Sequence, residues 1–236
     1  MNESLKRLKS VRQRIETACI AAGRQPDEVT LLAVSKRHPP EKVIILNKLG
    51  VISFGENQLQ EALQKQKALA AMELEWHFIG TIQSNKTRAI AEHFQWVQSV
   101  DRQKTLKRLS LQRPDSLAPL NVCLQVNIDQ EPQKAGASPE EIFQLAELCK
   151  GLDNIILRGL MAIPRMTVIA SDQHDSFRRV RILFEDLQNA GHVMDTLSMG
   201  MSSDLEIAIS EGSTMVRIGT DLLGERGLKH RHKDQT

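Results

Sequence analysis

The sequence of 236 residues contains no tyrosine, and aromatic residues amount to only 3% of it. Because 41% of the residues are apolar, a sizeable core is still possible, but aliphatic residues and methionine must build it. No apolar run reaches the length that crosses a membrane, and the N-terminus carries no apolar leader. These absences favour a soluble globular protein without a membrane partner.

Neither the net charge nor the cysteine spacing indicates a nucleic-acid or metal site. The chain has 31 Lys and Arg against 29 Asp and Glu, and a net charge of +2 does not suggest a nucleic-acid surface. Cys19, Cys123 and Cys149 lie in apolar positions with neither paired nor metal-ligand spacing. We therefore expect buried free thiols in a cytoplasmic protein, no metal site and no nucleic-acid partner.

Short apolar segments, each followed by a helical pattern, recur along the whole chain. Residues 3–22 carry apolar side chains at three- and four-residue steps, which predicts an amphipathic helix before the first strand. The segments expected to be strands are 29–35, 52–55, 76–79, 96–100, 122–128, 155–163, 197–199 and 215–218. A capping box with proline at the first helical position, Ser138-Pro139-Glu140-Glu141, predicts the start of one intervening helix.

Eight strands that alternate with helices predict an α/β fold with a single (β/α)8 TIM barrel and an extra N-terminal helix. We expect the barrel to occupy residues 1–228 and the basic residues 229–236 to form a flexible tail. A doubly wound open sheet is the alternative. It would usually show a glycine-rich nucleotide loop after the first strand, and the residues around Lys36 do not form one.

The closing stretch, from Leu197 to Arg226, has the composition of a phosphate site. Two strand ends rich in Gly, Ser and Thr lie one helix apart, one at Ser202-Ser203 and the other at Gly219-Thr220. Ser203 and Glu206 have the spacing of a capping box, and Gly212 is placed to end the helix. Backbone N–H groups and hydroxyls at such ends bind phosphate well.

Lys36 follows the first expected strand, and the first and last strands of a closed barrel are neighbours. One interpretation is a lysine that extends into solvent. The other is an amine that forms a Schiff base with a carbonyl compound bearing a phosphate, and pyridoxal 5′-phosphate (PLP) is the common cofactor of that kind. A sugar phosphate is a weaker alternative.

Sequence blocks over nearly the whole chain resemble the PLP homeostasis protein family. They are Leu32-Ala-Val-Ser-Lys36, Phe54-Gly-Glu-Asn-Gln-Leu-Gln-Glu61, Trp76-His-Phe-Ile-Gly-Thr-Ile-Gln-Ser-Asn-Lys86, Gly159-Leu-Met-Ala-Ile-Pro164, Leu197-Ser-Met-Gly-Met-Ser202 and Gly212-Ser-Thr-Met-Val-Arg-Ile-Gly219. The resemblance implies a barrel similar to the N-terminal domain of alanine racemase, with PLP held as a Schiff base on Lys36. It further implies the remaining cofactor-binding residues, which are Asn57 near the ring, Arg217 near the pyridine nitrogen, and Ser202, Gly219 and Thr220 at the phosphate.

Several positions depart from the pattern of that family. His38 replaces a smaller residue, and Asp221-Leu222-Leu223 replaces a more apolar end that usually contains phenylalanine. The loop Gln133-Lys134-Ala135-Gly136 stands where a Ser-Lys-Ser-Gly type is commoner. These departures concern the loops around the site and leave the expected cofactor unchanged.

Two classes of function follow from a PLP site, a carrier in PLP homeostasis and an enzyme such as an amino-acid racemase or lyase of low activity. An Arg217 cation near the pyridine nitrogen disfavours its protonation and weakens the ring as an electron sink. The related racemases use a second base, a tyrosine from another domain, whereas this chain has no tyrosine. We favour a monomeric carrier that buffers PLP or delivers it to apo-enzymes, with no catalytic residue assigned and enzymatic turnover left open.

Other polar residues have simpler interpretations. Arg217 alternatively forms a strand-end ion pair with Glu206 or Asp221. His77 is expected to be a hydrogen-bonded core residue. Lys86 and Lys134 are expected near the barrel mouth, either solvated or able to receive PLP.

Overall fold

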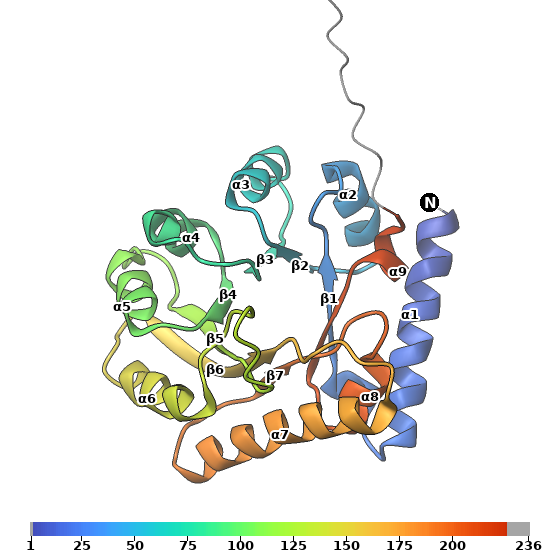
Figure 1. Cartoon of the computed structure of the whole chain (residues 1–236). Helices are drawn as coiled ribbons and strands as arrows, with labels where there is room; N and C mark the ends of the chain where they lie inside the picture. Colours follow the sequence, from blue (N-terminus) through green and yellow to red (C-terminus); the bar gives the residue numbers. More distant parts are fainter. Residues whose placement is uncertain (1, 226–236) are drawn as a thin grey trace, which may run out of the picture.

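Eight parallel strands close into a barrel in the order of the sequence, and helices surround it (Figure 1). The computed structural model describes residues 2–225, so the tail expected at 229–236 lies outside the described residues. The strands are β1 Thr30–Val34, β2 Ser53–Glu56, β3 Glu75–Phe78, β4 Trp96–Val100, β5 Leu120–Val126, β6 Ile155–Ala162, β7 Thr196–Ser198 and β8 Met215–Ile218. The predicted TIM barrel is confirmed, and the open sheet is excluded because β1 pairs with β8.

The helices connect successive strands on the outside of the barrel. They are α2 Pro40–Lys48, α3 Leu59–Ala68, α4 Thr87–His93, α5 Gln103–Gln112, α6 Pro139–Cys149, α7 Ala170–Asn189, α8 Leu205–Ser210 and α9 Thr220–Leu223, with short 3-10 turns η1 Pro26–Glu28 and η2 Ser84–Lys86. The additional helix α1, Asn2–Ala21, precedes the barrel and packs against α8 and α9. Its buried residues Leu8, Val11 and Ile15 follow the predicted periodicity.

Two separate apolar regions stabilise the barrel. The larger lies between the strands and the surrounding helices, and it includes Phe177, Val180 and Leu187 of α7. The smaller consists of Trp96, Cys123 and Met161. Because strand residues alternate between the two faces of the sheet, a strand of this barrel supplies both regions.

The local start and stop signals were only partly correct. At α6, Ser138 and Glu141 form the predicted reciprocal capping box. At α8 the predicted box is wrong, because the helix starts one residue later, with Asp204 as its N-cap, and Asp204 Oδ1 accepts from the Met201 amide at 2.6 Å. Gly212 ends that helix with φ +96°, a conformation that favours glycine.

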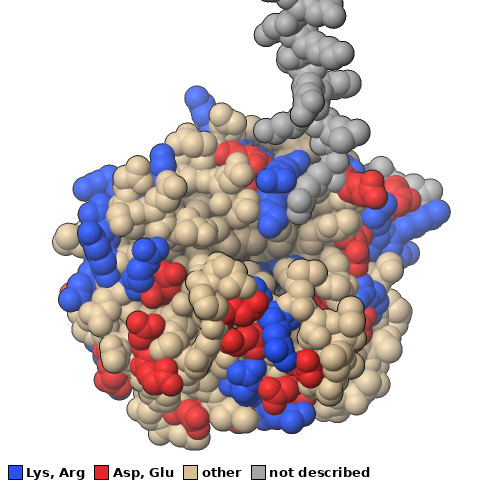
Figure 2. All heavy atoms as spheres, viewed as in Figure 1, with Lys and Arg blue, Asp and Glu red and all other residues tan. Residues whose placement is uncertain are grey.

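The expectation of buried free thiols is confirmed. Cys19, Cys123 and Cys149 are buried and unpaired. Basic and acidic side chains are interspersed over the face shown in Figure 2. Within residues 2–225, no helix is long and apolar enough to cross a membrane.

Candidate functional site

A cavity of about 300 Å³ lies at the carboxyl ends of the strands, where barrels of this type carry their functional groups. Its polar lining comes from Lys36, Ser202, Ser203, Arg217, Gly219 and Thr220. Its apolar lining comes from Val34, Ile79, Met161, Ile163 and Met201. The amine after β1 and the hydroxyl-bearing ends of β7 and β8 therefore face one cavity, as the order of the strands predicted.

A larger cavity, of about 480 Å³, lies at the opposite end of the barrel. It is bounded by α1, η1 and the residues that lead into β1 and β2, and its charged lining residues are Arg12, Glu16 and Asp27. No lysine lines it. We assign the site to the smaller cavity because that one combines an amine, a guanidinium and several hydroxyls.

Lys36 lies on a segment whose backbone is fixed on both sides. Lys65 Nζ donates to the Ser35 carbonyl at 2.7 Å, and the Arg37 amide donates to Glu61 Oε1 at 2.5 Å. Arg37 adopts φ +63°, an unusual conformation for a residue other than glycine. The half-buried Lys36 therefore leaves β1 in a direction that its neighbours impose.

The group that fixes this segment is a buried ionic cluster formed by Glu56, Glu61 and Lys65. Lys65 Nζ lies 2.6 Å from Glu56 Oε1 and 2.7 Å from Glu61 Oε1. Ser35 Oγ also donates to Glu56, at 2.6 Å. Burial raises the pKa of the Glu56 carboxyl, and the charge of Lys65 opposes that shift.

Arg217 projects from β8 into the barrel and is almost completely buried. One of its terminal nitrogens donates to the Ser198 carbonyl at 2.7 Å and to Ser198 Oγ at 2.8 Å, and the other donates to the Ala162 carbonyl at 2.9 Å. Burial lowers the pKa of Arg217 to about 10, so the side chain stays cationic at neutral pH. The ion pair considered with Glu206 or Asp221 is wrong, because another arginine engages both carboxylates.

That arginine is Arg14 of α1, which no sequence pattern singled out. It contacts Glu206 Oε1 and Asp221 Oδ2, each at 2.6 Å, and donates to the Ser202 carbonyl at 2.8 Å. Arg14 therefore links α1 to α8, to α9 and to the loop that lines the cavity. Because α1 precedes the barrel, this contact gives the extra helix a direct connection to the candidate site.

Asn57 does not line the cavity, although the resemblance placed it near the ring. It follows β2, and its Oδ1 is buried without a hydrogen-bond partner. Its carbonyl oxygen lies so close to Gly80 that a Cβ on Gly80 would approach it to 2.1 Å. Asn57 thus lies beside the loop after β3, and its role near the ring stays a prediction.

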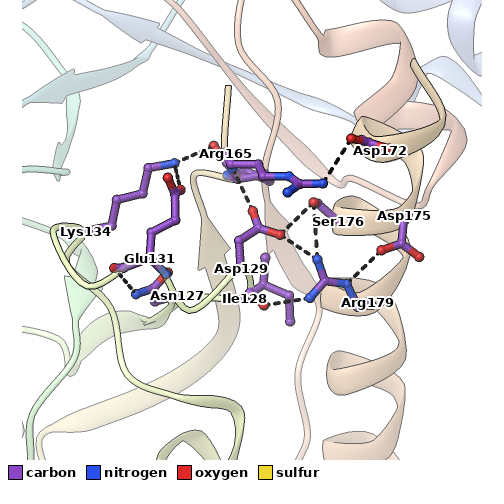
Figure 3. Close-up of polar contacts among 11 residues, drawn as sticks. Asn127, Ile128, Asp129, Glu131, Lys134, Arg165, Asp172, Asp175, Ser176 and Arg179 are labelled. Atoms are coloured by element: carbon purple, nitrogen blue, oxygen red, sulfur yellow. Dashed lines mark hydrogen bonds and ion pairs between the residues drawn. The ribbon is translucent and has the colours of Figure 1, made fainter. Parts of the chain in front are cut away.

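Lys134 belongs to a polar network between the loop after β5 and the start of α7 (Figure 3). It forms an ion pair with Glu131 and donates to the Pro164 carbonyl at 3.0 Å. In the same network, Asp129 accepts from the Arg165 amide at 2.7 Å. Lys134 is thus engaged with two chain segments, whereas Lys86 ends η2, and neither lines the cavity.

Comparisons with known proteins agree with this arrangement. The sequence profile described as alanine racemase, N-terminal domain, matches residues 7–227. The pyridoxal phosphate homeostasis protein of Pseudomonas aeruginosa is 57% identical over 226 residues, which cover 96% of this chain and 97% of that protein. The protein of the same name from Haemophilus influenzae is 47% identical, with 93% and 94% covered.

One solved structure extends the comparison to three dimensions. PipY of Synechococcus elongatus, solved with PLP bound, superposes with a TM-score of 0.82 at 35% identity. The match covers 94% of this chain and all of PipY. No group of three His, Cys, Asp or Glu residues within 2–225 is arranged to hold a metal ion. On the profile and on these near full-length relatives, the chain belongs to the pyridoxal phosphate homeostasis protein family, whose barrel is that of the alanine racemase N-terminal domain.

Proposed function

We propose that this chain binds PLP at the cavity between β1 and the ends of β7 and β8, and that it acts in PLP homeostasis. The observation that carries the proposal is the shared lining, in which Lys36 faces Ser202, Gly219 and Thr220 across about 300 Å³. Lys36 would hold the cofactor through a Schiff base, and the residues opposite would hold its phosphate. The relatives named for PLP homeostasis, and PipY with PLP bound, support the same assignment.

The residues present suit this cofactor. The cavity has the size of a small-molecule site, and its apolar walls suit a flat ring. The buried Oδ1 of Asn57 lacks a partner, and the backbone of Asn57 lies beside Gly80 in the loop after β3. When bound, PLP supplies an aldehyde for the amine and a ring that accepts electrons.

The positive charge of Arg217 favours a protein that buffers or delivers PLP over an enzyme that uses PLP in catalysis. The guanidinium stays protonated at neutral pH, and a cation near the pyridine nitrogen disfavours protonation of the ring. An unprotonated ring withdraws electrons weakly. We therefore propose that the protein retains PLP and passes it to apo-enzymes without robust catalysis.

The location and assembly of the protein complete the proposal. Buried, unpaired cysteines suit a reducing compartment, and we propose a cytoplasmic monomer. Light scattering of the purified protein tests the oligomeric state. Transfer of PLP to an apo-enzyme, followed by the recovery of that enzyme's activity, tests delivery.

The decisive experiment is borohydride reduction of the PLP-loaded protein followed by peptide mass spectrometry. We expect the reduced cofactor on the peptide that contains Lys36, and loss of that adduct in Lys36→Ala. An adduct confined to another lysine would overturn the assignment. Sensitive racemase and lyase assays run beside it, and turnover near ~1 s⁻¹, at the low end of ordinary enzymes, would favour the enzyme instead.

A further inference from the structure

A continuous chain of hydrogen bonds crosses the interior of the barrel and ends at Arg217. Arg217 donates to Ser198 Oγ at 2.8 Å, and Ser198 Oγ lies 2.7 Å from Gln98 Oε1. Gln98 Nε2 lies 2.8 Å from His77 Nδ1, and His77 Nε2 lies 2.8 Å from Glu75 Oε1. The chain thus joins a cation at the candidate site to a carboxylate at the start of β3.

The chemistry of Arg217 and Glu75 determines which atom donates in each hydrogen bond of this network. A guanidinium only donates, so Ser198 Oγ must accept from Arg217 and pass its own hydrogen to Gln98. An ionised carboxylate only accepts, so His77 must carry its hydrogen on Nε2. With Nδ1 of His77 free to accept, the Gln98 amide has a single orientation that satisfies both neighbours.

Burial and packing hold each member in place. Ser198, Gln98 and His77 are completely buried. The ring of His77 stacks on Trp96 with centroids 5.1 Å apart and an interplanar angle of 12°. Trp96 Nε1 in turn donates to the other oxygen of Glu75 at 3.0 Å.

Glu75 is well suited to anchor the far end. Besides His77 and Trp96, the Ser53 hydroxyl donates to it at 3.0 Å. The hydrogen bond from His77, with those from Trp96 and Ser53, lowers the pKa of Glu75 to about 2. Burial lowers the pKa of His77, so the imidazole is neutral at physiological pH.

The guanidinium at the cation end bonds neutral oxygens, as does that of the buried Arg113, but Arg217 also lines the candidate cavity. Within residues 2–225, no carboxylate lies within ion-pair distance of Arg217, and its recorded side-chain partners are carbonyl oxygens and the Ser198 hydroxyl. Ser198 contacts Arg217 through both its carbonyl and its hydroxyl. Two of the three hydrogen bonds of the guanidinium thus go to backbone carbonyls, and the third goes to a hydroxyl whose own direction is set by Gln98.

We propose that Ser198, Gln98 and His77 are positioning residues that hold the guanidinium of Arg217 in the orientation used toward bound PLP. The inference rests on the proposed function, since it concerns the same cavity. None of the three residues lines that cavity, so their effect on PLP passes through Arg217. This arrangement predicts that a change remote from the cavity alters the bound cofactor.

The first test needs no cofactor. In the PLP-free protein, side-chain ¹⁵N spectra at neutral pH should show His77 as the neutral Nε2–H tautomer. In Gln98→Met and in Ser198→Ala, the Arg217 guanidinium should rotate measurably faster than in the unchanged protein. An Nδ1–H tautomer, or guanidinium rotation unaffected in both variants, would overturn the proposal.

The second test uses PLP itself. We expect Gln98→Met and Ser198→Ala to weaken PLP retention by about threefold to tenfold and to shift the absorbance of the bound cofactor in the direction seen for Arg217→Met. His77→Gln, which supplies a donor and an acceptor at similar positions, should restore most of the affinity lost in His77→Phe. Cys123→Ala, which removes buried volume in the same interior, should leave the absorbance unchanged.

The outcomes separate the two proposals. If the unchanged protein retains PLP but Ser198→Ala and Gln98→Met match it in affinity and absorbance, the positioning role is wrong. If the unchanged protein retains no PLP, the proposed function fails. The spectra of the PLP-free protein still decide whether the hydrogen-bond network orients Arg217. Ser198→Ala removes one hydroxyl only, which keeps the test available if Gln98→Met does not fold.

Discussion

Two of the buried cations in this barrel, Lys65 and Arg217, have different surroundings. Lys65 is 4% exposed and lies within 2.7 Å of two carboxylates, Glu56 and Glu61. Arg217 is 5% exposed, yet its recorded partners are neutral oxygens. Lys65 is in direct contact with its counter-charges, whereas Arg217 interacts with the Asp204 carboxylate only at longer range and lines the cavity.

The presence or absence of a carboxylate contact also affects how much free energy of folding each buried cation costs. A buried ion pair is stabilised by its partner, and removal of one member leaves the other charge uncompensated. A buried arginine without a carboxylate contact loses solvation and gains only dipolar contacts in return. Such a group costs stability, and at Arg217 the guanidinium also lines the candidate cavity.

The largest expected effect concerns Lys65. Replacement of Lys65 by methionine leaves Glu56, which is fully buried, without its cation, and we expect about 3–5 kcal/mol of lost stability. Urea unfolding of the PLP-free protein measures it. Lys67→Met, on an exposed position of the same helix, is the matched control and should change stability by no more than about 0.5 kcal/mol.

A double variant sharpens that result. Lys65→Met combined with Glu56→Gln removes the charges of Lys65 and Glu56, and we expect it to recover part of the loss because only the partly exposed Glu61 then lacks its cation. Equal stability of Lys65→Met and Lys67→Met would show that the ionic cluster does not stabilise the fold. The contrast drawn between Lys65 and Arg217 would then be wrong.

Unlike Lys65→Met, Arg217→Met should affect PLP retention more than stability. We expect unfolding of the PLP-free protein to change by less than about 1 kcal/mol, because the lost hydrogen bonds are offset by relief of a buried charge. PLP retention should weaken by about tenfold or more, which corresponds to about 1.4 kcal/mol. Equilibrium dialysis and absorbance spectra measure this loss.

Arg158→Met is the control for that experiment. Arg158 also lies in the barrel wall, but it pairs with Asp195 and stacks over Trp96 away from the cavity. We expect PLP retention to be unchanged in this variant. Equal losses of PLP in both variants would mean that the effect is general destabilisation.

The sequence was sufficient for the fold and for most of the cavity lining. Each apolar run ends in a small or polar residue, and eight such units order themselves without long-range information, so Lys36 and Arg217 could be placed across one mouth. The same reasoning could not find Lys65, because Lys65 and Lys67 look alike in a helix of alternating Gln and Lys. Burial distinguishes them, and burial is set by packing against β1 and β2.

Ion pairs between residues far apart in the sequence could not be predicted either. Arg14 lies 192 residues from Glu206, and no periodicity in α1 distinguishes it from Arg12. The capping box expected at Ser203 was wrong for a local reason, since the helix begins after Asp204, whose side chain accepts from the preceding Met201 amide. Charged pairs and competing caps depend on geometry that spacing alone does not determine.

Arg14→Ala is expected to have an intermediate effect. It removes two ion pairs and the hydrogen bond to the Ser202 carbonyl, but the side chain is about one-third exposed, so we expect about 1–2 kcal/mol of lost stability. PLP retention should weaken about threefold because the loop at Ser202 loses an anchor. Arg12→Ala, exposed on the same helix, should change neither quantity, and identical behaviour of the two variants would contradict the link between α1 and the cavity.

The smallest effect concerns Glu75, the carboxylate at the far end of the hydrogen-bond network that leads to Arg217. Its pKa in the folded protein lies at about 2, below the ordinary value of 4.5. A carboxyl with a lowered folded-state pKa stabilises the protein above its unfolded-state pKa, and that stabilisation is lost as pH falls from about 4.5 to about 2. Since the Glu75 side chain is 38% exposed, we expect the loss to stay below about 1 kcal/mol. Unfolding of Glu75→Gln should show a correspondingly weaker pH dependence across this window, and an unchanged dependence would mean that the carboxylate does not anchor the chain that leads to Arg217.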